Sequence, residues 1–115
     1  MGLPVSVFSL ALVIDGQPEV GAIYAPFSDH LYWASRGRGA YMNSQPIHVS
    51  QHSLDDRVEM NVDWWPSAPW DVMQVVHDIA YEKDVYVMTV GSTTHAAALV
   101  AHGELVASIF TGTKG

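Results

Sequence analysis

Cysteine is absent from this chain of 115 residues, and basic residues are scarce. Without cysteine the protein forms neither disulfides nor thiolate metal sites, and a reducing cytoplasm is the expected compartment. Five Lys and Arg against twelve Asp and Glu give a net charge of −7. This balance argues against nucleic acids and anionic membranes as partners, because both select basic surfaces. A phosphorylated small molecule would need a local positive feature.

Long uninterrupted apolar runs are missing as well. The first run, residues 5–14, contains Ser6 and Ser9, follows no basic segment and ends at Asp15-Gly16, so it fits neither a signal peptide nor a membrane span. Hydrophobic residues nevertheless make up 49% of the chain and charged residues only 15%. This excess predicts a surface buried against a partner, and we expect a homodimer.

The length predicts one domain, residues 1–115, with two halves of different character. Residues 1–50 read as an antiparallel β meander, because short β-rich runs alternate with turn signals such as Asp15-Gly16. The expected strands are 5–14, 19–24, 31–35, 40–42 and 46–49. A polar connection at 51–57 then separates this half from the next.

Residues 58–115 read as an α/β half with the order strand, helix, strand, helix, strand. Helical spacing of apolar residues predicts a helix over 70–83, with Ser67 or Pro69 near its start. A second helix over 93–102 has Ser92 as N-cap and Gly103 as its stop. The strands are expected at 58–62, 85–90 and 105–110, which makes the fold class α/β (α+β).

Four stretches of sequence, in order, resemble the inositol monophosphatase family of Mg-dependent sugar and inositol phosphate phosphatases. They are residues 8–16 with 20–26 (a central hairpin), 36–43 with Pro46-Ile47 (a Gly-rich turn and short strand), 91–97 (a Gly-Ser-Ala-Ala helix start) and 100–103 (its Ala-x-Gly end). The resemblance covers nearly the whole chain but less than half of a complete family member. It implies a partial form of that family's layered sandwich.

The resemblance also implies what is missing. Family members hold Mg with a Glu-Glu pair, an Asp-Pro-Ile-Asp-Gly-Thr segment and a later Trp-Asp, and none of these carboxylates has a counterpart here. Gly2-Leu3-Pro4 resembles the Gly-Ile-Pro that follows the second group, and the chain stops near the position of the last one. Trp70-Asp71 precedes a different helix and takes no metal role. We therefore expect no cofactor in this chain, although complete members use Mg, and no catalytic residue in it.

The candidate substrate site is the turn Gly91, Ser92, Thr93 and Thr94, where a strand leads into a helix. Free backbone N–H groups and hydroxyls at such a position can bind a phosphate. The resemblance implies that Thr93 aligns with a residue that contacts substrate. The competing explanation is structural, with Ser92 acting only as a helix cap.

Other candidates carry a structural alternative too. Arg36 and Arg38 could contact an anion, or could simply be solvated in their turn. His95 and His102 are seven residues apart, whereas helical metal pairs favour about four. Trp64, Trp65 and Trp70 either form a protein interface or pack in the core.

Three functions follow from these observations. The first is a non-catalytic, self-associating scaffold built on a truncated phosphatase fold. The second is a Mg-dependent phosphomonoesterase whose metal site is completed by missing sequence or another chain. The third is a module that binds a small anion or sugar phosphate through the 91–94 turn.

Overall fold

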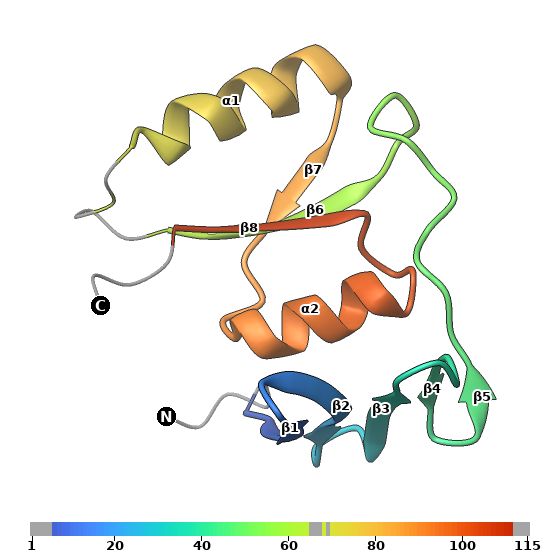
Figure 1. Cartoon of the computed structure of the whole chain (residues 1–115). Coiled ribbons are helices and arrows are strands. Elements are labelled where there is room, and N and C mark those ends of the chain that lie inside the picture. The colour runs from blue at the N-terminus through green and yellow to red at the C-terminus, as the bar shows by residue number, and fades with distance from the viewer. Residues whose placement is uncertain (1–5, 65–67, 69, 112–115) are drawn as a thin grey trace.

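The computed structural model describes residues 6–64, 68 and 70–111. These residues form two sheets and two helices (Figure 1). In chain order the elements are β1 Phe8–Ile14, β2 Gln17–Ala25, β3 His30–Ser35, β4 Ala40–Met42, β5 Gln45–Pro46, β6 Glu59–Asp63, α1 Val72–Lys83, β7 Tyr86–Met88, α2 Thr93–Ala101 and β8 Ala107–Phe110.

The first half of the chain forms a five-stranded antiparallel sheet with the order β1-β2-β3-β4-β5. Each strand pairs with the next one along the chain, as a meander requires. The β1–β2 turn is Asp15-Gly16, and both residues have positive φ, 51° and 77°. Asp and Gly tolerate this conformation, so the predicted hairpin is confirmed.

The second half forms a three-stranded parallel sheet with the order β7-β6-β8. Helix α1 connects β6 to β7, and α2 connects β7 to β8. Strand β6 is therefore central, with Met60 opposite both Val87 and Ala107. The predicted α/β fold class is confirmed.

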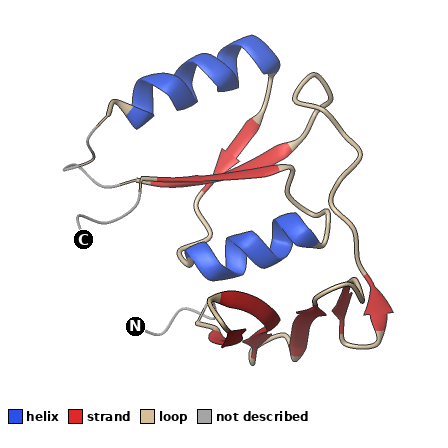
Figure 2. Ribbon diagram, viewed as in Figure 1, coloured by secondary structure: helices blue, strands red, loops and turns tan. Residues whose placement is uncertain are grey.

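The elements stack in four layers, which Figure 2 shows most clearly. Helix α1 covers one face of the parallel sheet and α2 lies against its other face. The antiparallel sheet lies on the far side of α2, which makes α2 the layer between the two sheets. Among the described residues, no helix is long and apolar enough to cross a membrane.

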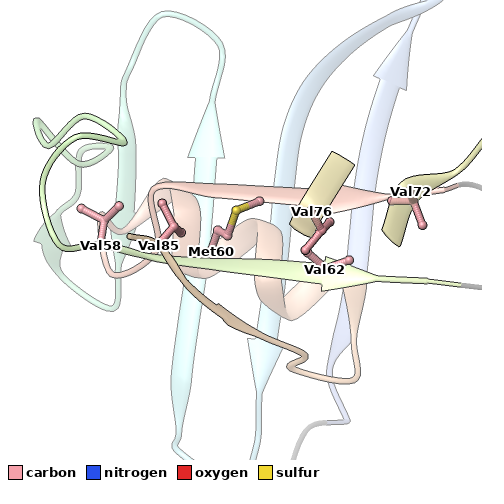
Figure 3. Packing of buried hydrophobic residues seen from close by; sticks show 6 residues of the cluster. All are labelled: Val58, Met60, Val62, Val72, Val76 and Val85. Carbon is pink, nitrogen blue, oxygen red and sulfur yellow. The ribbon is translucent and has the colours of Figure 1, made fainter. Parts of the chain in front are cut away.

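A valine-rich core joins α1 to the parallel sheet (Figure 3). Met60 and Val62 of β6 are 1% and 5% exposed, and Val72 of α1 is 0% exposed. The cluster consists of Val58, Met60, Val62, Val72, Val76 and Val85. Burial of a side chain of this size stabilises a fold by about 1.5–3 kcal/mol.

A second, smaller core joins α2 to the antiparallel sheet. Tyr32 of β3 and Ile47 pack against Ala98 of α2, and all three are buried. The alanines of α2 allow the helix to approach the sheet closely. This core holds the two halves of the protein together.

Several predicted boundaries need correction. The first helix begins at Val72 and not at residue 70, because the Asp71 side chain caps it by accepting a hydrogen bond from the Gln74 N–H. Ser67 and Pro69, the predicted start, lie outside the described residues. The strand expected at 46–49 is Gln45–Pro46, because Ile47 turns into the second core.

The strand expected at 85–90 is also shorter, since β7 ends at Met88. Beyond it, the Thr89 hydroxyl donates to the Val62 carbonyl at 2.9 Å and the Val90 N–H donates to the Asn61 side chain at 2.7 Å. These bonds replace the backbone pairing that a longer β7 would make with β6. The second helix and its Ser92 cap are confirmed.

Candidate functional site

The candidate site lies at the carboxyl edge of the parallel sheet. All three strands run in one direction, so Asp63 of β6, the segment after Met88 of β7 and Phe110 of β8 meet at this edge. Asp63 and Phe110 are direct partners in the register. In open α/β sheets, ligands bind outside the carboxyl ends of the strands.

The Asn61 side chain connects the structural elements that meet at this edge. Its side chain belongs to the central strand and is fully buried, at 0% exposure. Its amide nitrogen donates to Asp63 Oδ2 at 2.9 Å and to Ser108 Oγ at 3.0 Å, and its oxygen accepts from the Val90 N–H at 2.7 Å. One side chain thus ties β6, β8 and the β7–α2 connection together, and its burial is compensated by three hydrogen bonds.

The β7–α2 connection turns at Gly91, whose φ is +91°. Ser92 follows in extended conformation, and its hydroxyl accepts a hydrogen bond from the His95 N–H at 3.2 Å. Ser92 is therefore a genuine N-cap, as the structural alternative predicted. The cap accepts from the His95 N–H and leaves the N–H groups of Thr93 and Thr94 for other acceptors. These groups have no intrahelical acceptor, because they lie in the first turn of the helix.

The electrostatics of this helix start suit an anion. The first turn of α2 contains no acidic residue, so the positive end of the helix dipole is not neutralised from within the helix. Thr93 is exposed and Thr94 is partly buried. The four predicted residues, Gly91 to Thr94, therefore come together in one turn that can donate hydrogen bonds to a phosphate.

The described residues do not fit a magnesium site by themselves. Among them, no three His, Asp or Glu side chains gather closely enough to hold a metal ion. Asp63 is at the sheet edge, but one of its oxygens already accepts from Asn61. Because Mg²⁺ requires a near-octahedral set of oxygen ligands, further carboxylates or substrate oxygens would have to complete the site.

Arg36 and Arg38 lie in the turn between β3 and β4. The Arg36 guanidinium donates to the Pro18 carbonyl at 2.6 Å and to Gln17 Oε1 at 3.3 Å, and its Nε is 3.3 Å from Glu19 Oε1. This arginine therefore holds β2 to the end of β3. Arg38 is exposed, and its contact with an anion stays a prediction.

The predicted histidines and tryptophans do not join the site as a group. His95 lies in α2 and His102 directly follows it, and the Nδ1 atom of each is buried without a hydrogen-bond partner in the described part of the chain. His102 Nδ1 is 3.1 Å from Glu104 Oε1. Trp64, just after β6, is 47% exposed and Trp70, just before α1, is 43% exposed. Trp65 lies outside the described residues. The exposure of Trp64 and Trp70 argues against simple core packing, and an interface role stays a prediction.

An apolar groove of about 390 Å³ lies between α2 and the antiparallel sheet. Small residues line it, including Ala97, Ala98 and Ala101 of α2 and Gly21 of β2, and Thr94 is also part of its wall. This lining offers few partners for the hydroxyls of a sugar. The groove is better suited to apolar side chains than to a sugar phosphate.

Sequence reasoning missed Asn61, Asp63, Thr89 and Ser108. Asn61 gave a readable signal, because a lone amide between Met60 and Val62 interrupts an apolar strand, and a buried polar group needs partners. The identity of those partners was not readable. Asp63 is two positions away, but Val90 and Ser108 lie 29 and 47 positions away along the chain.

Comparison with known proteins places these features in a family. The family model described as "Inositol monophosphatase family" matches residues 2–115. Among curated relatives, the fructose-1,6-bisphosphatase/inositol-1-monophosphatase of Aquifex aeolicus is 43% identical over 51 residues, which are 44% of this chain and 19% of the relative. The aligned part is thus a small share of that protein.

Solved structures match over a longer span. The IMPase of Thermotoga maritima superposes with a TM-score of 0.79 at 24% identity. The match covers 90% of this chain and 39% of the T. maritima chain. The inositol monophosphate-bound IMPase-II of Staphylococcus aureus gives a TM-score of 0.70 at 27% identity. The match covers 86% of this chain and 39% of the S. aureus chain. The chain spans about two fifths of these structures.

Proposed function

Because the chain belongs to the inositol monophosphatase family, we propose that it supplies the substrate-binding side of a Mg-dependent phosphomonoesterase site. The observation that carries the proposal is the α2 start, where Gly91 and the Ser92 cap present backbone N–H groups at the carboxyl edge of the parallel sheet. The related S. aureus structure with bound inositol monophosphate supports a phosphorylated polyol as ligand.

Each residue of this turn has a definite task in the proposal. Gly91 allows the backbone to turn, and Ser92 fixes the first turn of α2. The N–H groups of Thr93 and Thr94 donate to phosphate oxygens. Asn61 fixes the position of the turn relative to the sheet by accepting a hydrogen bond from the Val90 N–H.

In this proposal the isolated chain binds substrate but does not hydrolyse it. Magnesium supplies charge neutralisation and an activated water in such reactions, and uncatalysed hydrolysis of phosphate monoesters is extremely slow. The described residues do not gather a metal site. Carboxylates from other sequence, in the same protein or in a second chain, would have to complete it.

The binding step can be tested with inositol 1-phosphate. Titration followed by NMR is expected to shift the backbone amide signals of Thr93 and Thr94. Thr93→Glu places a negative charge at the exposed helix start, where it favours the helix but repels phosphate. We expect at least a five-fold weaker affinity for Thr93→Glu, with Thr93→Gln close to the unchanged protein.

Two controls decide what the result means. Free inositol is expected to produce no shifts, since the phosphate is the group recognised. Phosphate release from the isolated chain with Mg²⁺ is expected to stay at background, and to rise when a chain containing the Asp-Pro-Ile-Asp-Gly-Thr segment is added. Equal binding by Thr93→Glu and Thr93→Gln would contradict the site. Binding that no added chain converts to hydrolysis would favour a sugar-phosphate binding module.

A second candidate function is a self-associating scaffold. The observation that favours it is β1, whose seven residues are all exposed even though they are almost entirely apolar. Phe8 and Leu10 are 64% and 66% exposed. Such a surface is characteristic of a protein interface.

A further inference from the structure

Three chemically different groups lie on one face of the parallel sheet at its carboxyl edge. In β6, Val62 packs in the α1 core, so the alternation of side chains turns Asp63 to the α2 face. In β8, Ile109 packs against the same core, so Phe110 also faces α2. Helix α2 begins at this edge (Figure 1). The Gly91–Thr94 turn, Asp63 and Phe110 therefore share one edge and one face.

Hydrogen bonds support this placement. Asn61, two positions before Asp63, donates to Asp63 Oδ2 at 2.9 Å and accepts from the Val90 N–H at 2.7 Å. One amide group thus separates the Asp63 carboxylate from the chain just before the turn. Ser108, two positions before Phe110, accepts from the same amide at 3.0 Å. The side chains of β6 and β8 on this face are therefore tied to the β7–α2 connection.

The order of the strands arranges the three groups in a line. The turn follows β7, Asp63 ends β6 and Phe110 ends β8, and the strand order is β7-β6-β8. Asp63 and Phe110 are direct register partners. Because neighbouring strands are about 4.8 Å apart, the line extends over about 10 Å. It runs from backbone N–H donors, past a carboxylate acceptor, to an aromatic ring.

Phe110 gives this line its specificity. Neither core cluster of the described residues includes Phe110, whose side chain is 59% exposed. A phenyl ring offers no hydrogen bond to the hydroxyls of an inositol ring, but it stacks on a nucleobase with about 1–3 kcal/mol. Asp63 still accepts from a ligand hydroxyl, because an ionised carboxylate has about four acceptor sites.

We propose that Asp63 and Phe110 select a nucleoside monophosphate, with its phosphate at the Gly91–Thr94 turn, its ribose hydroxyls on the Asp63 carboxylate and its base stacked on Phe110. Phosphate, ribose and base then follow one another in the order of β7, β6 and β8. This inference rests on the proposed phosphate site and names the class of its ligand.

Titrations of the chain in EDTA, followed by NMR, compare ligands that differ in one group. Adenosine 5′-monophosphate should bind at least five-fold more tightly than ribose 5-phosphate, which lacks the base, and more tightly than inositol 1-phosphate. 2′-Deoxyadenosine 5′-monophosphate should bind at least three-fold more weakly than the ribonucleotide, since it lacks one hydroxyl. Asp63→Asn should reduce this last difference to less than two-fold, because a hydrogen bond to a charged acceptor is stronger.

Substitutions of Phe110 separate stacking from a structural role. Phe110→Leu keeps an apolar side chain but removes the ring, so the affinity for adenosine 5′-monophosphate should fall at least five-fold. Its affinity for ribose 5-phosphate should change by less than two-fold. Phe110→Trp keeps a ring and should bind the nucleotide within two-fold of the unchanged chain. Phe27→Leu is the matched control, because Phe27 is 68% exposed in the turn between β2 and β3, and it should change neither affinity.

The inference is overturned by equal affinities for adenosine 5′-monophosphate and ribose 5-phosphate. It is also overturned if Phe110→Leu binds the nucleotide normally or weakens both ligands equally. In these cases the phosphate site survives as long as ribose 5-phosphate shifts the Thr93 and Thr94 amide signals and Thr93→Glu weakens it. If none of the phosphate esters shifts those signals, the proposed function itself is wrong.

Discussion

The two sheets of this protein differ in how much of each is covered. Met60, Asn61 and Val62 in the centre of the parallel sheet are at most 5% exposed, whereas Phe8 to Ile14 of the antiparallel sheet are all exposed. In the described part of the chain, the parallel sheet has a helix on each face, while the antiparallel sheet has α2 on one face only (Figure 2). The apolar residues of the chain therefore lie in two different environments, a buried core around β6 and an exposed strand, β1.

Asn61→Leu should have the largest effect on this contrast. It removes the partner of the Val90 N–H, of Ser108 and of Asp63 in a fully buried position. We expect a loss of about 3 kcal/mol in the free energy of unfolding, measured in urea. Asn43→Gly is the matched control in the antiparallel half. Its exposed side chain accepts from the Leu31 N–H at 2.9 Å and donates to the Asp29 carbonyl at 3.5 Å. Because water can replace both bonds, the loss should be below about 1 kcal/mol. Equal losses would contradict the difference between the halves.

Gly103→Ala should break the junction between the two halves. Gly103 follows α2 with φ +83°, and an added Cβ would lie 2.9 Å from the His48 carbonyl oxygen. Backbone strain and this clash should together cost about 2–4 kcal/mol.

Gly37→Ala separates the two causes. Gly37 also has positive φ, +73°, but nothing lies within 4 Å of an added Cβ. Its cost should be about 1 kcal/mol, from the backbone conformation alone. If both variants unfold at the same urea concentration, the close approach of Gly103 to residues 48–50 does not add to the loss of stability in Gly103→Ala.

A pair of Val→Ala substitutions compares the cores directly. Val76 of α1 is 7% exposed, and its truncation should cost about 2 kcal/mol through lost burial and a cavity. Val13 of β1 is 56% exposed, and its truncation should cost below about 0.5 kcal/mol in the monomer. Equal costs for the two substitutions would contradict the difference between the two sheets.

The smallest effect is a pH dependence at the junction. Burial raises the pKa of the Tyr32 hydroxyl, and the Glu104 carboxylate raises it further. The folded state thus holds this proton more tightly than the unfolded state, whose pKa is about 10. The resulting stability is complete below pH 10 and is lost as the pH rises towards the folded pKa.

Tyr32→Phe should therefore reduce the loss of stability above pH 10, as measured by urea unfolding at several pH values. Tyr81→Phe is the control, since Tyr81 is 80% exposed on α1. The same pH dependence in both variants would show that Tyr32 does not contribute.

Local signals predicted most elements of the fold. The Asp15-Gly16 turn, the apolar spacing along α1 and the Ser92 cap each depend on residues close together in the chain, and each is confirmed. Boundaries failed where a distant contact intervened. Strand β5 stops at Pro46 because Ile47 packs against α2, and β7 stops at Met88 because Thr89 and Val90 bond to β6.

The candidate site shows the same division. The sequence predicted the Gly91–Thr94 turn, because a strand, a glycine and a capping serine adjoin there. It did not predict that Asn61 supports this turn, since the two are brought together only by the parallel register of β6 and β7.

The sequence by itself determined the family, the α/β class and the Gly91–Thr94 turn with its Ser92 cap, because motifs and caps are local. Only the tertiary structure decided that α2 lies between the two sheets, that Asn61 ties β6, β8 and the β7–α2 connection together and that the residues of β1 are exposed. These features depend on which surfaces remain uncovered after packing, and packing is a property of residues far apart in the chain.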